Sequence, residues 1–187
     1  NGVFVMDGSR RSGHGNAYFT GLGNKKRIVF FDTLLESLTP EEIEAVLAHE
    51  LGHYKHRHVQ KSMVLTFSLT FAALALLSWL MQQPWFYLGL GVGAASIHMA
   101  LLLFMLVAPS FGFFIKPILS YWQRRHEFEA DAFAIEHTDK QPLSHALVKL
   151  YKENAATLTP DTLYSSVYDS HPPAPVRIHH IESYEPL

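Results

Sequence analysis

The feature that most constrains the fold is a long stretch without permanent charge, because residues 62–115 contain no Lys, Arg, Asp or Glu. A helix needs about 20 apolar residues to cross the hydrocarbon core of a bilayer. The stretch is long enough for two spans, predicted at 62–81 and 85–107, with a tight connection at Gln82-Gln83-Pro84. We therefore expect residues 59–115 to form a transmembrane hairpin.

The rest of the chain is long enough for one compact domain, which the hairpin would interrupt. Residues 1–58 are expected to form its N-terminal part and residues 116–187 its C-terminal part. The formal net charge of −2 gives no reason to expect a nucleic-acid partner. The chain has no cysteine, so any metal must be held by histidines and carboxylates.

Basic residues near the ends of the hairpin predict which side of the membrane those ends face. The predicted connection is uncharged. Basic residues precede the first span (Lys55, Arg57 and Lys61) and follow the second (Lys116, Arg124 and Arg125). Both outer ends should therefore face the cytoplasm, and the hairpin should return the chain to the side that it left.

The local pattern predicts a mainly α fold with a small β-sheet. Residues 3–6 and 27–31 are rich in β-branched and aromatic side chains, and residues 17–19 fit a third strand. Thr39-Pro40-Glu41-Glu42 has the signature of a helix start, with Thr39 as the N-cap and Glu42 completing a capping box. That helix is expected to run to His58 and to merge with the first span. Further helices are expected at 121–138, 143–154 and 176–183.

The sequence His49-Glu50-Leu51-Gly52-His53 is the candidate metal site. Residues four apart lie on one face of a helix, so His49 and His53 can both direct a ring nitrogen at one zinc ion. Glu50 is placed to take a proton from a water molecule bound there. The alternative is a pair of surface histidines on a basic helix end, where other histidines also occur.

A catalytic zinc site needs a third protein ligand, and candidates lie in the segment RRHEFEADAFAIEH. Glu127 and Asp131 are four apart and share a face, whereas Glu129 points away from both. We expect Glu127 to be the ligand and Asp131 to orient a ligand histidine or its surroundings. The alternative is a solvated acidic face. The hairpin between His53 and Glu127 would bring the two halves of the site together.

Five motifs in this order, NAYFTG, RIVFFDTLLE, HELGH, EFEADAFA and SHPP, resemble the type I CAAX prenyl protease family. The resemblance covers essentially the whole chain. It implies an integral-membrane zinc endopeptidase of the gluzincin kind, with a zincin-like metalloprotease domain interrupted by the hairpin. It implies one Zn²⁺ held by His49, His53 and Glu127, with Glu50 as general base.

The resemblance also implies active-site roles for His171, Asn16 and Arg177. His171 is able to donate a hydrogen bond to the oxyanion of a cleaved peptide bond, although a His before Pro-Pro is more often a loop residue. Asn16 precedes the possible edge strand at Ala17 and Tyr18, to which a substrate peptide could add; the alternative is a turn Asn. Arg177 is able to pair with an acidic residue or a substrate carboxylate, unless it is a solvated helix charge.

The family has further membrane helices ahead of this region, so we expect this chain to be part of a longer protein. The passage between DTLLE and TPEEI is short, where eukaryotic members often have a long charged insertion, which favours a bacterial inner membrane. The expected substrates are peptides or lipidated proteins, such as prenylated CAAX proteins. The first alternative is a quality-control protease of misfolded membrane proteins. The second is a non-enzymatic zinc-binding membrane protein or transporter, for which His98 is the one histidine or acidic residue inside the predicted spans.

Overall fold

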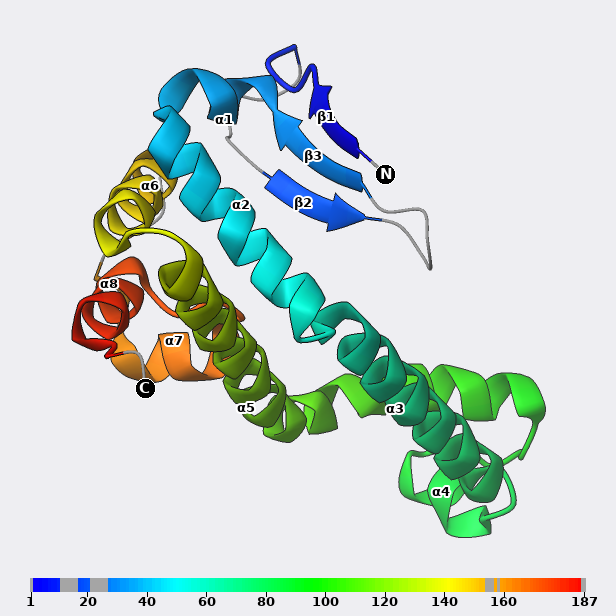
Figure 1. The fold of residues 1–187 in the computed structure, drawn as a ribbon. Helices are drawn as coiled ribbons and strands as arrows, with labels where there is room; N and C mark the ends of the chain where they lie inside the picture. Colours follow the sequence, from blue (N-terminus) through cyan, green and yellow to red (C-terminus); the bar gives the residue numbers. More distant parts are fainter. Residues whose placement is uncertain (1, 11–16, 21–26, 154–156, 158, 186–187) are drawn as a thin grey trace. The chain divides into compact units, whose positions relative to one another are not determined.

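The computed structural model describes residues 2–10, 17–20, 27–153, 157 and 159–185. The chain divides into two compact units, residues 1–58 with 120–187 (unit 1) and residues 59–119 (unit 2). It leaves unit 1 after His58 and returns to it at Ser120. Figure 1 follows this path from the N-terminal sheet through the helices. Unit 1 is thus built from two segments that lie far apart in the sequence.

Unit 1 begins with a small sheet of three strands, β1 (Gly2–Met6), β2 (Ala17–Thr20) and β3 (Arg27–Phe31), in the order β1-β3-β2. β3 pairs in parallel with β1, from Gly2 opposite Arg27, and antiparallel with β2, from Ala17 opposite Phe30. The three predicted strands are confirmed. β2 lies at one edge of the sheet and contacts helix α2.

Two helices follow the sheet, α1 (Asp32–Ser37) and α2 (Pro40–Lys55). The predicted start of α2 is confirmed: the Thr39 hydroxyl accepts from the Glu42 amide, and the Glu42 carboxylate accepts from the Thr39 amide at 2.8 Å. α2 ends earlier than expected, at Lys55, because Arg57 adopts a left-handed conformation (φ 56°). The expected continuous helix to His58 is therefore wrong, and helix α3 begins there as a separate element.

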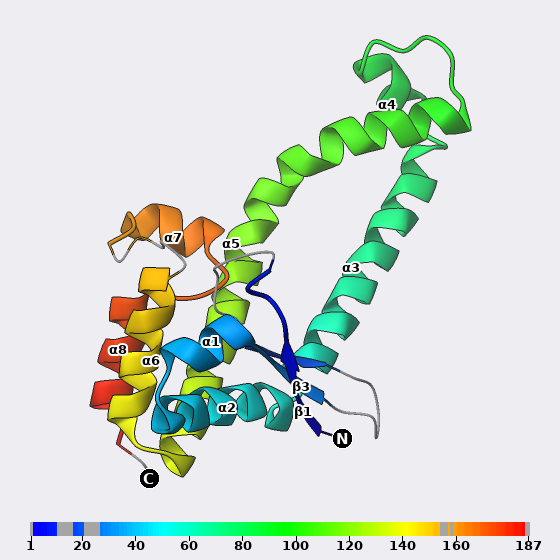
Figure 2. The same cartoon turned by 90° about the horizontal axis from the view of Figure 1, so that it is seen from above.

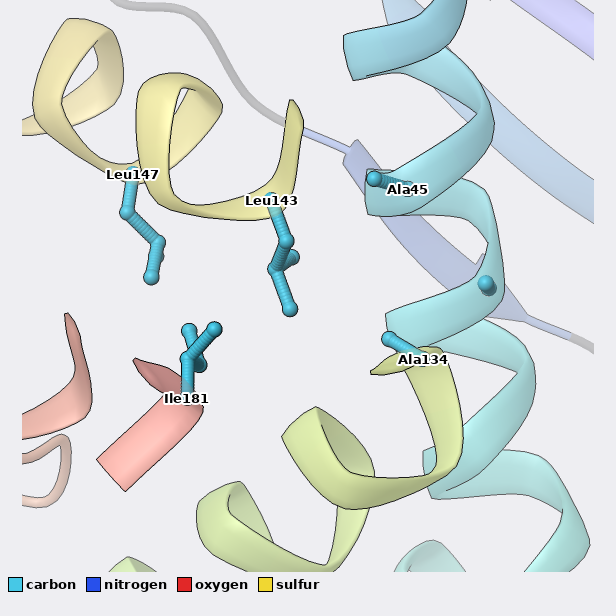
Figure 3. Close-up of a cluster of buried hydrophobic side chains, with 6 residues drawn as sticks. Ala45, Ala134, Leu143, Leu147 and Ile181 are labelled. Atoms are coloured by element: carbon cyan, nitrogen blue, oxygen red, sulfur yellow. The ribbon is translucent and has the colours of Figure 1, made fainter. Parts of the chain in front are cut away.

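Four helices of unit 1 enclose its main apolar core. They are α2, the C-terminal part of α5 (Ile97–His137), α6 (Lys140–Glu153) and α8 (Ala174–Ser183). Figure 3 shows their side chains converging, with small residues on α2 and α5 and larger ones on α6 and α8: Ala45, Ala134, Leu143, Leu147 and Ile181. In Figure 1, the sheet lies on one side of α2 and α6 on the other.

Gly52 sets the distance between α2 and α5. A Cβ added at this position would lie 3.0 Å from the Cα and carbonyl oxygen of Ala130 and 3.1 Å from the Cβ of Phe133. Real Cβ atoms rarely approach backbone atoms this closely, so only glycine permits the two helices to pack as they do. This packing brings the HELGH segment against the segment that contains Glu127.

Unit 2 consists of the membrane-length helix α3 (His58–Leu80), the short helix α4 (Pro84–Gly89) and the first part of α5. Figure 2 shows α3 and α5 meeting near α4. A small core forms at this end from residues of all three helices: Leu77, Phe86, Tyr87, Ala100 and Leu103. α3 and α5 are long and apolar enough to cross a membrane, with only 6% and 11% of their most apolar windows buried.

The hairpin differs from the prediction at its second limb. The expected span at 85–107 is two elements, because α4 ends at Gly89 and α5 begins only at Ile97. Gly91 adopts a positive φ of 80° between them, which favours glycine. α5 then continues without interruption through Pro109 and Pro117 to His137, so the separate helix predicted at 121–138 is the end of α5.

The mainly α class with a small sheet is confirmed, and the helices predicted at 143–154 and 176–183 correspond to α6 and α8. Helix α7 (Thr162–Tyr168) was not predicted. The side chain of Asp161 caps it by accepting from the Tyr164 amide at 2.8 Å. α7 precedes the SHPP segment, which connects it to α8.

Candidate metal centre

Three ligand atoms converge between α2 and α5. The Nε2 atoms of His49 and His53 are 3.1 Å apart, as expected for residues four apart on a helix. A carboxylate oxygen of Glu127 lies 3.8 Å from the His49 Nε2, and the other lies 3.4 Å from the His53 Nε2. Together these three residues form a cluster able to hold a metal ion, with all ligand atoms within 4.8 Å of one another.

The spacing of these atoms fits zinc. Bonds of about 2.0–2.1 Å at tetrahedral angles place neighbouring ligand atoms about 3.3 Å apart. The three measured separations, 3.1, 3.4 and 3.8 Å, bracket this value. Two neutral imidazoles and one carboxylate are also a donor set that catalytic zinc uses, with a fourth position left open.

His49 is held by a buried carboxylate. Its Nδ1 lies 2.9 Å from an oxygen of Asp131, whose side chain has no exposed surface. The carboxylate accepts a hydrogen from Nδ1, which leaves Nε2 with its lone pair directed at the cluster. Asp131 therefore fixes both the orientation and the tautomer that a ligand histidine needs.

Arg177 joins the two acidic residues of the site. Its guanidinium donates to both oxygens of Asp131, from Nε at 2.8 Å and from a terminal nitrogen at 2.6 Å. Its other terminal nitrogen lies 3.2 Å from Glu127. Arg177 is buried, with 6% of its surface exposed. Such a bidentate pair is directional and compensates charges that would otherwise be costly to bury.

The electrostatics keep the candidate ligands in the protonation states that bind a metal. Burial disfavours the charge of Glu127, but the hydrogen bond from His171 and the charge of Arg177 outweigh it, so the pKa of Glu127 lies below its ordinary value. Burial and the neighbouring His49 lower the pKa of His53 to about 3. At neutral pH the carboxylate is therefore ionised and the imidazole is neutral, as metal ligation requires.

Glu50 follows His49 on α2 and lines the same cavity as the three ligands. Burial raises the pKa of Glu50, while the charges of His49 and Arg177 oppose the shift. A carboxylate whose pKa is raised toward neutrality is a better proton acceptor at physiological pH. The position and the environment of Glu50 both suit a general base.

His171 reaches the cluster from the SHPP segment. Its Nδ1 lies 3.0 Å from Glu127, and its side chain, 65% exposed, lines the cavity. The hydrogen bond to Glu127 raises the pKa of His171 against the effect of burial. Arg177 and His171, both predicted from the resemblance, thus lie beside Glu127, and Asp131 lies beside His49.

Two residues that the sequence did not predict for the site hold the segment that bears His171. A terminal nitrogen of Arg124 donates to the carbonyls of Ser166 (2.8 Å) and Asp169 (3.1 Å). The Tyr151 hydroxyl donates to the carbonyl of Pro172 at 3.0 Å. No sequence signal predicts such contacts, because any carbonyl is the same acceptor whatever its side chain.

A cavity of about 740 Å³ opens at the cluster. Its lining includes the three candidate ligands, Glu50 and His171, together with apolar side chains from α1, α2 and α6: Leu34, Val46, Leu143, Ala146, Leu147 and Leu150. Ala17 of β2 lines it as well, and Tyr18 is 38% exposed on the same edge strand. Asn16 lies outside the described residues.

Comparisons with known proteins agree with the motifs. Residues 1–185 match the model of peptidase family M48. The chain is 37% identical over 186 residues to CAAX prenyl protease 1 of Saccharomyces cerevisiae. This alignment covers 91% of the chain and 41% of the yeast protein. It is 31% identical over 210 residues to the CAAX prenyl protease 1 homolog of Homo sapiens, covering 91% of this chain and 44% of that protein.

A solved structure is similar over nearly the whole chain. The crystal structure of S. mikatae Ste24p matches with a TM-score of 0.82 at 38% identity, covering 96% of this chain and 44% of that one. The chain therefore belongs to peptidase family M48, and the resemblance inferred from its motifs is confirmed. This family implies a bound metal, for which the cluster provides a place. The chain spans less than half the length of these relatives.

Proposed function

We propose that this chain forms the catalytic part of a membrane zinc endopeptidase. The observation that carries the proposal is the convergence of His49, His53 and Glu127 beside Glu50 in one cavity. The family membership supports the same reaction, since the relatives are named CAAX prenyl proteases. When bound, zinc supplies a Lewis acid that polarises a peptide carbonyl and lowers the pKa of a water ligand.

The protein groups around the ligands then have distinct roles. Glu50 accepts the proton of the attacking water and afterwards delivers it to the leaving amine. His171 donates a hydrogen bond to the carbonyl oxygen of the substrate as negative charge develops there. Asp131 and Arg177 hold His49 and Glu127 in place and keep the charge of the site balanced.

The substrate is a peptide in extended conformation. β2 lies at the edge of the sheet and beside the cavity, so a peptide is able to pair with Ala17 and Tyr18 by backbone hydrogen bonds. Asn16 is proposed to contribute at the start of this strand. The apolar side chains that line the cavity accept apolar side chains of a substrate, which fits the aliphatic residues of a CAAX sequence as well as segments of unfolded membrane proteins.

The membrane holds the substrate near the site. Helices α3 and α5 of unit 2 are proposed to span the bilayer, with unit 1 on the cytoplasmic side, because both ends of the hairpin carry lysines and arginines and residues 82–96 carry no charge. Only Leu38 and Thr39 separate α1 from α2, and this short connection favours a bacterial inner membrane.

The deciding experiment uses the full-length protein in liposomes. Glu50→Gln is expected to retain zinc and to lose at least about 100-fold in the rate of peptide hydrolysis, because it removes the general base. Hydrolysis that persists in this variant would refute the role of Glu50. Metal analysis with and without a chelator establishes whether zinc is the resident ion.

Two alternative functions give different results in the same preparation. A quality-control protease cleaves an unfolded membrane protein faster than a farnesylated CAAX peptide. A transporter moves zinc across the vesicle membrane without peptidase activity. Residues 59–119 contain no carboxylate to pair with His98, which lies exposed near the start of α5. This weakens the case for a metal path through the spans.

A further inference from the structure

The second ring nitrogen of His53 faces another histidine. The Nε2 of His53 is directed at the metal cluster, and its Nδ1 lies 2.9 Å from the Nδ1 of His58. On the other side of the His58 ring, Nε2 lies 3.1 Å from a carboxylate oxygen of Glu129. The three side chains therefore form a continuous line of hydrogen bonds that starts at a candidate ligand.

One arrangement of hydrogens satisfies the whole line. If His53 binds a metal through Nε2, its hydrogen is on Nδ1 and is donated to the Nδ1 of His58. The single hydrogen of neutral His58 is then on Nε2, from which it is donated to the carboxylate of Glu129. Each donor in the line then faces an acceptor, and the carboxylate at the end fixes the direction.

The fold holds His58 in this position. It is the first residue of α3 and follows Arg57, whose left-handed conformation separates α2 from α3. His58 is 3% exposed, and its ring stacks on that of His126 at 4.0 Å with an angle of 9° between the planes. A ring packed in this way has little freedom to rotate away from His53.

Glu129 is fixed as well. It lies on α5 two residues beyond Glu127, and Arg125 contacts its second oxygen at 3.2 Å. Helix geometry turns Glu129 away from the face that carries Glu127 and Asp131, and toward His58. Helix α5 therefore supplies the third candidate ligand, Glu127. It also supplies the carboxylate that contacts His49, Asp131, and the carboxylate that contacts His58, Glu129.

We propose that His58 and Glu129 are positioning residues for the ligand His53, a role that rests on the zinc site proposed above. Each ligand imidazole then has its own carboxylate. Asp131 contacts His49 directly, whereas Glu129 acts on His53 through the ring of His58. Loss of His58 frees the ring of His53 to rotate and to change tautomer, which weakens metal binding without removing a ligand.

The test measures zinc affinity and the environment of the metal in the purified full-length protein, with peptide hydrolysis as a secondary reading. Zinc affinity is obtained by competition with a chromophoric chelator, and Co²⁺ bound in place of zinc gives an absorption spectrum that reports ligand geometry. His58→Leu keeps an apolar body and removes both hydrogen bonds. It is expected to weaken zinc binding about 10–100-fold, as loss of such outer partners of a ligand does, and to alter the Co²⁺ spectrum.

A conservative variant separates this role from a merely structural one. The amide of His58→Gln has an oxygen to accept from His53 and a nitrogen to donate to Glu129, so it is expected to restore most of the affinity. His145→Leu changes an exposed histidine on α6 and is the matched control, with unchanged affinity. Zinc should also raise the melting temperature less in His58→Leu than in the wild type. If His58 were merely structural, the substitution would lower the melting temperatures of the zinc-free and zinc-bound protein equally.

Each outcome is informative. If the wild type binds no zinc, the proposed function itself fails. If the wild type binds zinc and folded His58→Leu binds it equally well with the same Co²⁺ spectrum, only the positioning role is overturned. If His58→Leu does not fold, Glu129→Gln decides, since Glu129 is partly exposed: weaker zinc binding supports the proposal, and unchanged binding contradicts it.

Discussion

Units 1 and 2 place their charged and apolar side chains in opposite ways. Unit 1 buries charge, as Asp131 has no exposed surface and Arg177, Glu127 and Glu42 are nearly covered. Unit 2 exposes apolar rings, with Phe71 75% exposed on α3. In water, exposed aromatic side chains at this density are unfavourable, but in a bilayer they are solvated by lipid. The contrast indicates that the two units fold in different solvents.

The difference also predicts where substitutions matter. In unit 1, the costly changes are those that leave a buried charge without its partner. In unit 2, they are those that place a charge on a surface in contact with lipid. Four predictions test this contrast, in decreasing order of the expected effect.

Arg177→Ala should have the largest effect. It leaves Asp131 and Glu127 buried without their shared cation, which is expected to cost about 3–5 kcal/mol in the free energy of unfolding. The measurement is denaturant unfolding of the protein in detergent. The control is Arg10→Ala, because Arg10 pairs with Asp7 at an exposed position, where the expected loss is at most about 1 kcal/mol. Equal losses of unfolding free energy in the two variants would contradict the view that burial makes the loss of Arg177 costly.

Phe71→Asp tests unit 2. Phe71 lies near the middle of α3, where exchanging an aromatic ring for a carboxylate raises the free energy of membrane insertion by about 3–4 kcal/mol. A glycosylation-based insertion assay of the segment measures this change. Phe71→Leu is the control and should insert as well as the wild type. Normal insertion of the aspartate variant would contradict a lipid-facing position for this side chain.

Gly52→Ala and Gly112→Ala make the same change in the two units. At Gly52, the added methyl meets the backbone of Ala130 at 3.0 Å, so we expect a loss of about 1–3 kcal/mol in the free energy of unfolding, together with weaker zinc binding. At Gly112, within α5, no atom lies within 4 Å of the added Cβ, so stability should be unchanged or slightly higher. A loss of similar size at both positions would contradict the close packing of α2 on α5.

Glu42→Gln tests a partly buried ion pair by its pH dependence. Lys149 lies 2.6 Å from the Glu42 carboxylate. Burial opposes the charge of Glu42, but Lys149 and the Thr39 amide outweigh it and lower the pKa of Glu42. Because the folded pKa is below the unfolded one, this stabilisation is present above the unfolded pKa of about 4.3 and is lost as the pH falls through the folded pKa.

The expected loss in Glu42→Gln is about 1–2 kcal/mol at pH 7. The difference between variant and wild type should close as the pH falls below about 4. Thermal unfolding of both proteins at several pH values measures this. A difference that stays constant from pH 7 to pH 3 would mean that the charge of Glu42 contributes nothing to stability.

Local signals in the sequence were sufficient for the strands and for the start of α2. Residues 28–31 are β-branched or aromatic, and Thr39 and Glu42 form the capping box that their spacing predicts. The spacing of His49 and His53 placed both rings on one face. The pairing of Glu127 with them needed the predicted hairpin as well, because an acidic helix segment alone is equally consistent with a solvated face.

The parts that were missed depend on tertiary contacts. Arg57 breaks the expected long helix by a left-handed conformation that arginine rarely adopts, so no local pattern predicts it. Pro109 and Pro117 are helix breakers in water, yet α5 continues through both. His58 looked like one more histidine in a His-rich segment, and only its distances to His53 and Glu129 distinguish it.

The order of the elements along the chain has a consequence for biosynthesis. His49 and His53 are translated before unit 2, and Glu127 only after it. A nascent chain that has not completed the hairpin therefore carries two of the three metal-binding side chains and lacks the carboxylate. The protein cannot assemble this cluster on the ribosome until the hydrophobic segments have been synthesised, so hydrolytic capacity would arise only as a late step of its own maturation.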